Sequence, residues 1–125
     1  MARLMIGFRD WQGRAEPDDA SIRASVTRLL ADPNTEYLLA GEPPAGVLQL
    51  RFRHSVWTGT DDAHLEDLFV DAKARGSGLG RALLEAALAR ARERRCARIE
   101  LYRSVGFSSW SEAAGGNDLF MRLRL

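Results

Sequence analysis

The spacing of apolar residues divides this chain into segments of two kinds. Two segments repeat apolar residues every three or four positions, as amphipathic helices do: one begins at Pro17 and ends at Asp32, and one runs from about Gly78 to Arg94. The remaining apolar runs are short and predict strands, at Leu4–Phe8, Glu36–Ala40, Val47–Val56, Leu65–Val70, Cys96–Leu101, Phe107–Ser111 and Leu119–Leu125. This order, β-α-β-β-β-α-β-β-β, predicts an α+β fold with a mixed, mostly antiparallel sheet flanked by helices.

Periodicity also predicts which faces of two segments are buried. In the strand Val47–Val56, apolar Leu48, Leu50 and Phe52 alternate with polar residues, so one face is expected in water. In the long helix the apolar positions form one stripe, made of Leu83, Leu84, Ala87, Leu88 and Ala91. Its charged residues fall mostly outside that stripe and predict a solvated helix face, not a nucleic-acid surface.

Composition and length narrow the classes of protein to consider. A chain of 125 residues, 46% of them hydrophobic, is expected to form a single domain over residues 1–125. The net charge of +1 argues against nucleic acid or a membrane surface as a partner. The single cysteine, Cys96, cannot form an internal disulfide and is expected to be a packing residue. With an N-terminus that lacks a signal-like apolar run, this predicts a cytoplasmic protein.

The stretch from Asp71 to Ala91, D-A-K-A-R-G-S-G-L-G-R-A-L-L-E-A-A-L-A-R-A, predicts an anion-binding site. A strand leads into a glycine-rich turn and then a long helix, whose first N–H groups have no partners within the helix. Glycines in the turn let a phosphate approach those donors. No Gly-Lys-Ser/Thr follows, and the G-x-G-x-x-G spacing is absent, so neither a P-loop nor a dinucleotide fingerprint is present.

Three motifs together resemble one known family. They are R-x-x-G-x-G, read at Arg75, Gly78 and Gly80; L-E-D-L-F-V, at 65–70; and L-Y-R-S-V-G-F, at 101–107. The chain is similar over nearly its whole length to the GNAT acetyltransferase superfamily, in particular its diamine and aminoglycoside-acetyltransferase-like members. The resemblance implies acetyl transfer from acetyl-CoA to a primary amine of a small molecule or peptide, with no metal.

The resemblance also implies a set of cofactor-binding residues. Backbone N–H groups from Arg75 to Gly80 would bind the pyrophosphate of coenzyme A. Phe69 and Val70 would pair with the pantetheine arm, which adds like a strand to an open sheet edge. The cofactor-binding residues expected on this basis are Leu68, Phe69, Val70, Arg75, Gly76, Ser77, Gly78, Leu79, Gly80 and Arg81.

Two residues are candidates for acid–base catalysis. Glu66 and Asp67 are expected on a strand beside the thioester, facing opposite ways, and Glu66 is favoured as the base that takes the amine proton. A structural role as a surface or salt-bridged carboxylate is an equal alternative. Tyr102, which matches the tyrosine of the family's L-Y-x-x-x-G-F segment, would donate a proton to the leaving thiolate; an ordinary strand-end tyrosine is the alternative.

The junction between Leu101 and Tyr102 departs from the family. Relatives place a crossover helix of a dozen or more residues there, since parallel strands need one. The four residues 102–105 span at most about 14 Å, less than the roughly 17–20 Å of a strand that a return path must retrace. Either a mobile crossover helix is missing from the chain as written, which we favour, or the C-terminal hairpin is rearranged or swapped onto a second subunit.

Several weaker expectations complete the picture. His54 and His64 are expected near the ends of adjacent strands, but two histidines alone make a poor metal site. Trp57 is a candidate to line a substrate cleft with Phe52, and Trp11 to cover the same region. Exposed C-terminal strands make a homodimer plausible. The alternatives to an enzyme are a non-catalytic acyl-CoA-binding or protein-interaction module of the same fold, and a nucleotide-binding domain.

Overall fold

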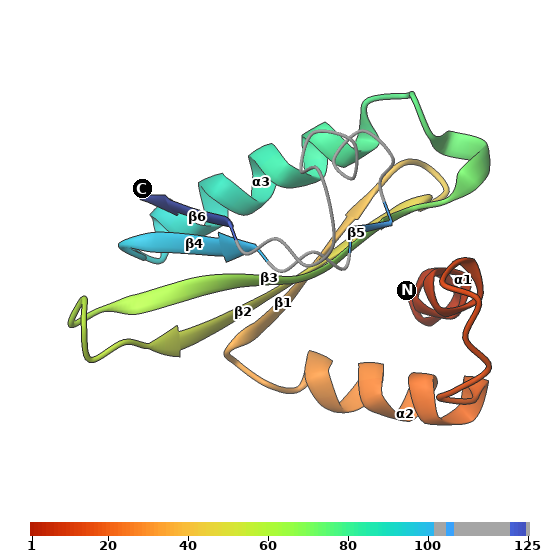
Figure 1. The fold of residues 1–125 in the computed structure, drawn as a ribbon, viewed down its shortest axis with the longest axis horizontal. Helices are drawn as coiled ribbons and strands as arrows, with labels where there is room; N and C mark the ends of the chain where they lie inside the picture. The colour runs from red at the N-terminus through yellow and green to blue at the C-terminus, as the bar shows by residue number, and fades with distance from the viewer. Residues whose placement is uncertain (102–104, 107–120, 125) are drawn as a thin grey trace.

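The computed structural model describes residues 1–101, 105–106 and 121–124. Two helices precede a run of three strands, and a third helix leads into the last strands (Figure 1). In chain order the elements are α1 (Ala2–Trp11), α2 (Asp19–Leu30), β1 (Thr35–Ala40), β2 (Gly46–His54), β3 (Asp61–Val70), the 3₁₀ turn η1 (Ala72–Ala74), α3 (Leu79–Glu93), β4 (Arg98–Leu101), β5 (Val105–Gly106) and β6 (Met121–Arg124).

The strands form one mixed sheet in the order β1-β2-β3-β4-β6. β1, β2 and β3 pair antiparallel, β4 runs parallel to β3, and β6 runs antiparallel to β4. The parallel pair is joined through α3, a connection long enough for a crossover. This confirms the α+β class with a mostly antiparallel sheet. It also confirms the helix predicted from Gly78 to Arg94 within one residue at each end.

The main core lies between α3 and one face of the sheet. The apolar stripe of α3 is confirmed: Leu83, Ala87 and Ala91 are buried, and Leu84 and Leu88 pack against the same cluster. The sheet contributes the alternating apolar residues of β2 and their neighbours on β3, namely Leu48, Leu50, Phe52, Ala63, Leu65 and Leu68. Cys96 is buried in this core, and burial raises the pKa of its thiol, as expected for a packing residue.

The opposite face of the sheet is covered by α1 and α2 (Figure 1). The strand predicted at Leu4–Phe8 is wrong, because these residues lie within α1. Leu4 and Phe8 stand on one helical face, and Phe8 stacks on Phe69 of β3 with 5.3 Å between ring centroids. A run of only five residues fits both the helical and the strand spacing, so the sequence pattern does not distinguish a helix from a strand. The residues that pack against the run determine which of the two forms.

The connection between α1 and α2 is held by charge. The Arg9 guanidinium forms ion pairs with Asp10, at 2.6 Å, and Asp19, at 2.8 Å, and donates to the carbonyl oxygen of Pro17. The α2 N-terminus is capped by Asp18, whose side chain accepts from the Ser21 N–H at 2.8 Å. This confirms the helix start predicted at Pro17–Asp18 and fixes the two helices beside each other.

β4 and β5 pair one after the other with the same edge of β3. β4 pairs Leu101 with Leu65 of β3, and β5 pairs Val105 with Leu68, both in parallel. From the first of these pairs to the second, the chain advances by four residues while β3 advances by three. β4 and β5 therefore follow one another in the same direction, and no crossover is needed between them. The strand predicted at Phe107–Ser111 and the junction at Tyr102 lie outside the described residues, and a missing crossover helix there stays a prediction.

Two glycines provide a test that α1 is a helix. Gly7 is inside α1, where a Cβ would make ordinary contact with Phe69 Cε1 at 3.4 Å; Gly13 follows the helix with φ +70° in open space. We expect Gly7→Ala to raise the free energy of unfolding by about 0.5–1 kcal/mol. Gly13→Ala should lower it by about 1 kcal/mol, because alanine is strained at positive φ. Urea denaturation measures both; a destabilising Gly7→Ala would contradict the helix.

Candidate functional site

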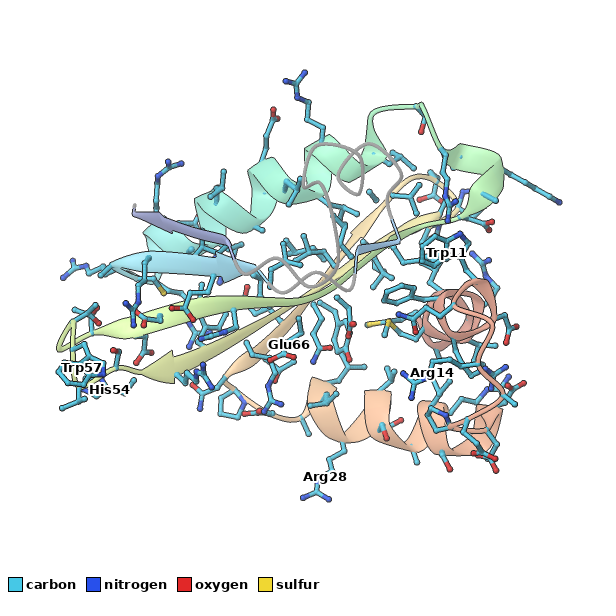
Figure 2. The ribbon with its side chains drawn as sticks, in the orientation of Figure 1. Trp11, Arg14, Arg28, His54, Trp57 and Glu66 are labelled. Carbon is cyan, nitrogen blue, oxygen red and sulfur yellow. The ribbon has the colours of Figure 1, made fainter. Side chains whose placement is uncertain are left out.

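One extra residue in β3 determines how its two carboxylates are placed. Asp67 pairs with Gln49 of β2, but the next pair is Leu65 with Leu50, so Glu66 has no partner on β2. This β-bulge interrupts the alternation of the strand. Leu65 and Leu68, three positions apart, both enter the α3 core. The prediction that Glu66 and Asp67 face opposite ways is therefore wrong: Figure 2 places Glu66 on the side covered by α2, where Asp67 also lies.

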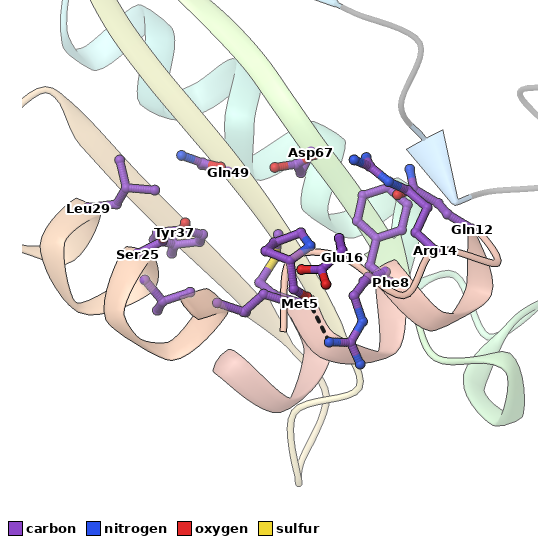
Figure 3. A pocket seen from close by; sticks show the side chains of 14 residues that line it. Met5, Phe8, Gln12, Arg14, Glu16, Ser25, Leu29, Tyr37, Gln49 and Asp67 are labelled. Atoms are coloured by element: carbon purple, nitrogen blue, oxygen red, sulfur yellow. Dashed lines mark hydrogen bonds between the residues drawn. The ribbon is translucent and has the colours of Figure 1, made fainter. Parts of the chain in front are cut away.

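Asp67 ends a polar row that crosses three strands. Tyr37 of β1 is in register with Gln49 of β2, and Gln49 with Asp67 of β3. This row forms the floor of a pocket of about 270 Å³ between the sheet and the two N-terminal helices (Figure 3). The other residues that line the pocket are Met5, Phe8, Arg9, Gln12, Arg14, Glu16, Pro17, Ile22, Ser25, Val26 and Leu29.

Burial perturbs both titratable groups of the floor. The pKa of Asp67 rises to about 6, mainly because burial disfavours its charged form and secondarily because the Glu66 carboxylate is close. The pKa of Tyr37 rises to about 12, again first through burial and then through the charge of Asp67. A carboxyl group with a pKa near 6 is ionised at neutral pH and still basic enough to accept a proton. Such groups are typical of functional sites.

A second feature is the turn that leads into α3. Gly76 and Gly78 have φ of +80° and +84°, conformations that side chains rarely adopt, and a Cβ at either position would meet open space. Gly78 is the N-cap of α3 and provides no side-chain hydrogen bond to the helix. The first N–H groups of α3, at Leu79, Gly80 and Arg81, are thus left without intrahelical partners. Together these features fit the anion site predicted from the sequence.

Two other residues of the turn have structural contacts. The Ser77 hydroxyl donates to the carbonyl oxygen of Ala74, which closes the turn. The Arg81 side chain is exposed and lies 3.9 Å from Glu85. Neither contact uses the N–H groups of Leu79, Gly80 and Arg81 at the helix start.

The side chain of Arg75 extends from the turn toward the end of β3 and toward α1. Its Nε donates to the carbonyl oxygen of Val70 at 3.1 Å. Its guanidinium lies 5.1 Å from the ring centroid of Trp11 and 5.9 Å from that of Phe69. These contacts join the turn to α1, whereas the Arg75 backbone N–H donates to the carbonyl oxygen of Ala72 within the turn.

The edge of β3 that was expected to be open is occupied. Leu68 pairs with Val105 and Phe69 with Gly106, both in parallel. The free edge expected at Phe69 and Val70 is therefore wrong at Phe69 in this structure, whereas β5 has no pair at Val70. β5 is a strand of two residues, and its displacement costs few backbone hydrogen bonds.

These observations, an anion-binding turn before a helix and a polar pocket beside a bulged strand, agree with the comparison to known families. The model described as "Acetyltransferase (GNAT) family" matches residues 5–108. The chain belongs to the GNAT acetyltransferase family. No curated protein matches the sequence.

Several solved structures resemble the chain as well. A putative acetyltransferase from Arthrobacter sp. FB24 is 31% identical, with a TM-score of 0.70, over 93% of this chain and 76% of that one. A structure titled transcriptional regulator, from Bacillus halodurans C-125, is 28% identical, with a TM-score of 0.64, over 78% and 69%. An aminoglycoside 6'-N-acetyltransferase from Acinetobacter haemolyticus shares the fold at 20% identity, with a TM-score of 0.63, over 88% and 79%.

The histidines of this GNAT domain do not meet. His54 lies at the end of β2, and its side chain is 68% exposed. His64 is buried three register positions away. Its Nε2 lies 2.9 Å from Arg53 and 3.1 Å from Glu100. Burial, and then the charge of Arg53, lowers the pKa of His64. Among the described residues, no three His, Cys, Asp or Glu side chains gather as a metal site would require.

Two tryptophan expectations are wrong, and one catalytic expectation is untested. Trp57 is 88% exposed at the tip of the β2–β3 hairpin, while Phe52 is buried in the core, so they do not form a cleft. Trp11 lies at the opposite end of the molecule, beside Arg75 (Figure 2). Tyr102, the expected general acid, lies outside the described residues. Within the part of the chain that the structure describes, no helix is long and apolar enough to cross a membrane.

The sequence missed three contributors to the pocket. Tyr37 and Gln49 carry no motif, and only the strand register aligns them with Asp67. The third contributor is α1, whose residues the sequence predicts as a strand; it supplies Met5 and Phe8, and Gln12 follows at its C-terminal end. Leu4, Phe8 and Trp11, spaced four and three residues apart, are the signal that indicates this helix.

Proposed function

We propose that this protein is an N-acetyltransferase that moves the acetyl group of acetyl-CoA to a primary amine. The observation that carries the proposal is Asp67, a carboxyl group with a pKa of about 6 at the floor of a pocket in a GNAT fold. The reaction needs a group that removes a proton from an amine, and a carboxyl group with this pKa that lines a pocket supports Asp67 in that role. The family generally uses acetyl-CoA as its acetyl donor.

The acceptor binds in the pocket with its nitrogen toward the floor. The acceptor enters as an ammonium ion and first gives one proton to the Asp67 carboxylate, which later releases it to water. The neutral nitrogen then attacks the thioester carbonyl carbon, the C–S bond breaks, and the nitrogen loses its second proton to water as the amide forms. The thiolate takes up one proton to become free coenzyme A. Glu66, favoured as the base from the sequence, lies on the same side of the sheet and is the alternative proton acceptor. Tyr102 is the proposed donor of the proton to sulfur.

The proposed cofactor site is the turn before α3. Gly76 and Gly78 leave the N-terminus of the helix uncovered, and Leu79, Gly80 and Arg81 provide the first N–H groups there. These donors suit the pyrophosphate of coenzyme A. The pantetheine arm would extend from the turn toward the end of β3, and it would have to replace β5 at Leu68 and Phe69.

That pairing of β5 favours a second function. With Leu68 and Phe69 engaged, the protein would be a non-catalytic module of the GNAT fold that binds coenzyme A through the turn alone, or binds another protein. Turnover with acetyl-CoA and an amine separates this function from that of an N-acetyltransferase.

We propose as well that the chain works as a single cytoplasmic domain, as a homodimer, without nucleic acid or membrane partners.

The first functional prediction concerns Asp67. At pH 7.5, Asp67→Asn should lower kcat/KM by about 10²-fold or more, the usual loss for a general base. In the wild type, kcat/KM should rise with pH through an apparent pKa of about 6, because only the ionised carboxylate accepts the proton. That rise should be absent in Asp67→Asn. The measurement is thiol release from acetyl-CoA between pH 5 and 8.

Glu66→Gln serves as the comparison. Since the charge of Glu66 raises the pKa of Asp67, this variant should keep most of its activity and shift the rise to lower pH. A collapse of activity in Glu66→Gln beside full activity in Asp67→Asn would assign the base to Glu66 and overturn the assignment of Asp67.

The second functional prediction concerns the turn. Asparagine tolerates positive φ, so Gly78→Asn should fold normally, but its side chain occupies and caps the helix N-terminus. We expect the Kd for coenzyme A, measured by calorimetry, to rise about tenfold or more. Gly59→Asn is the matched control, because Gly59 also has positive φ (+68°) and open surroundings, in the distant β2–β3 hairpin. Equal affinity in both variants would place the pyrophosphate elsewhere.

A further inference from the structure

The pocket on the Asp67 side has a floor and walls of different chemistry (Figure 3). Its floor is the polar row Tyr37, Gln49 and Asp67. Its walls come from α1 and α2 and are mainly apolar, formed by Met5, Phe8, Ile22, Val26 and Leu29. A ligand that matches this arrangement has one polar end, directed at the sheet, and an apolar body held between the helices.

The volume of the pocket limits the size of that ligand. At about 270 Å³ it lies just below the range of roughly 300–1,000 Å³ typical of small-molecule sites. A single ring with a short side chain fits inside such a space, whereas an aminoglycoside of several sugar rings could place only one ring in it and would leave the others outside. On the helix side, the Arg9 ion pair with Asp19 joins α1 to the start of α2.

The charges along the pocket limit the ligand's own charge. Among the described residues that line the pocket, the acidic ones are Asp67 at the floor and Glu16, and the Glu66 carboxylate lies close to Asp67. Two guanidiniums, Arg9 and Arg14, line the same pocket. Arg9 is paired with carboxylates, but Arg14 forms no ion pair within the described residues, and Figure 2 shows it between α1 and α2. A second ammonium group on the ligand would meet this positive charge.

We infer that the acceptor is a primary monoamine carried on a compact apolar body, of the arylalkylamine type. The inference rests on the proposed function, since it places the acceptor nitrogen at Asp67. The ammonium group is attracted to the Asp67 carboxylate, and the ring packs against Phe8, Val26 and Leu29. Polyamines are disfavoured by Arg14 and aminoglycosides by volume, although the sequence motifs resemble acetyltransferases of both classes.

The test compares three amines with the intact chain, phenethylamine, spermidine and kanamycin. Binding is measured by calorimetry in the presence of coenzyme A, and turnover by thiol release from acetyl-CoA. We expect phenethylamine to bind at least about tenfold more tightly than either polycation, and to give the highest kcat/KM. Tighter binding of spermidine or kanamycin overturns the inference, whether or not any amine is acetylated.

The two measurements keep the inference and the proposed function apart. Acetylation of spermidine in preference to phenethylamine would contradict the inference and leave the proposed N-acetyltransferase intact. Selective binding of phenethylamine without turnover of any amine would support the pocket assignment and contradict catalysis.

A charge-reversal pair tests the part assigned to Arg14. Arg14→Glu should raise the affinity for spermidine relative to phenethylamine by about fivefold, because the second ammonium group then meets a carboxylate. Arg28→Glu makes the same change of charge on α2, where the side chain projects away from the sheet (Figure 2), and should leave the ratio unchanged. Equal ratios in the two variants would remove Arg14 from the explanation and overturn the argument from charge.

Discussion

The arrangement of the candidate site depends on the β-bulge at Glu66. In a regular strand Leu65 and Leu68, three positions apart, would face opposite sides of the sheet, and one of them would leave the α3 core. With it, both leucines stay buried, and Asp67 enters register with Gln49 and Tyr37 on the other face. The bulge thus satisfies the core and supplies the pocket with its carboxylate at once.

The site costs the folded protein some stability. The pKa of Asp67 is raised to about 6 in the folded state, above its ordinary value of 3.8. A carboxyl group whose pKa is raised on folding contributes to the free energy of unfolding at low pH, where it is protonated. That contribution is lost as the pH rises from about 4 through about 6. Around neutral pH the protein therefore holds a buried carboxylate that favours protonation. This is the state in which Asp67 can accept a proton from a bound amine.

The parts of the fold that the sequence predicts are those governed by local periodicity. The α3 stripe and the core face of β2 are confirmed because each segment is long enough to show its period. The expectation that the other face of β2 lies in water is wrong at Val47 and Gln49, which are buried. The segment Leu4–Phe8 is too short for its pattern to distinguish a helix from a strand. It forms a helix that buries Leu4 and Phe8 against Val47 and Phe69. The glycine turn was found by motif. The row of Tyr37, Gln49 and Asp67 was not, because register across strands and the bulge have no local sequence signal.

The central claim is that the bulge buries an ionisable Asp67 in the pocket beside Glu66. The most direct measurement is the titration of the Asp67 side-chain carboxyl carbon by NMR, assigned with Asp67→Asn. The account predicts an apparent pKa of about 6. It also predicts a lower pKa in Glu66→Gln, because the neighbouring charge is gone. A pKa near the ordinary 3.8, unchanged by Glu66→Gln, would contradict the burial of Asp67 and with it the proposed base.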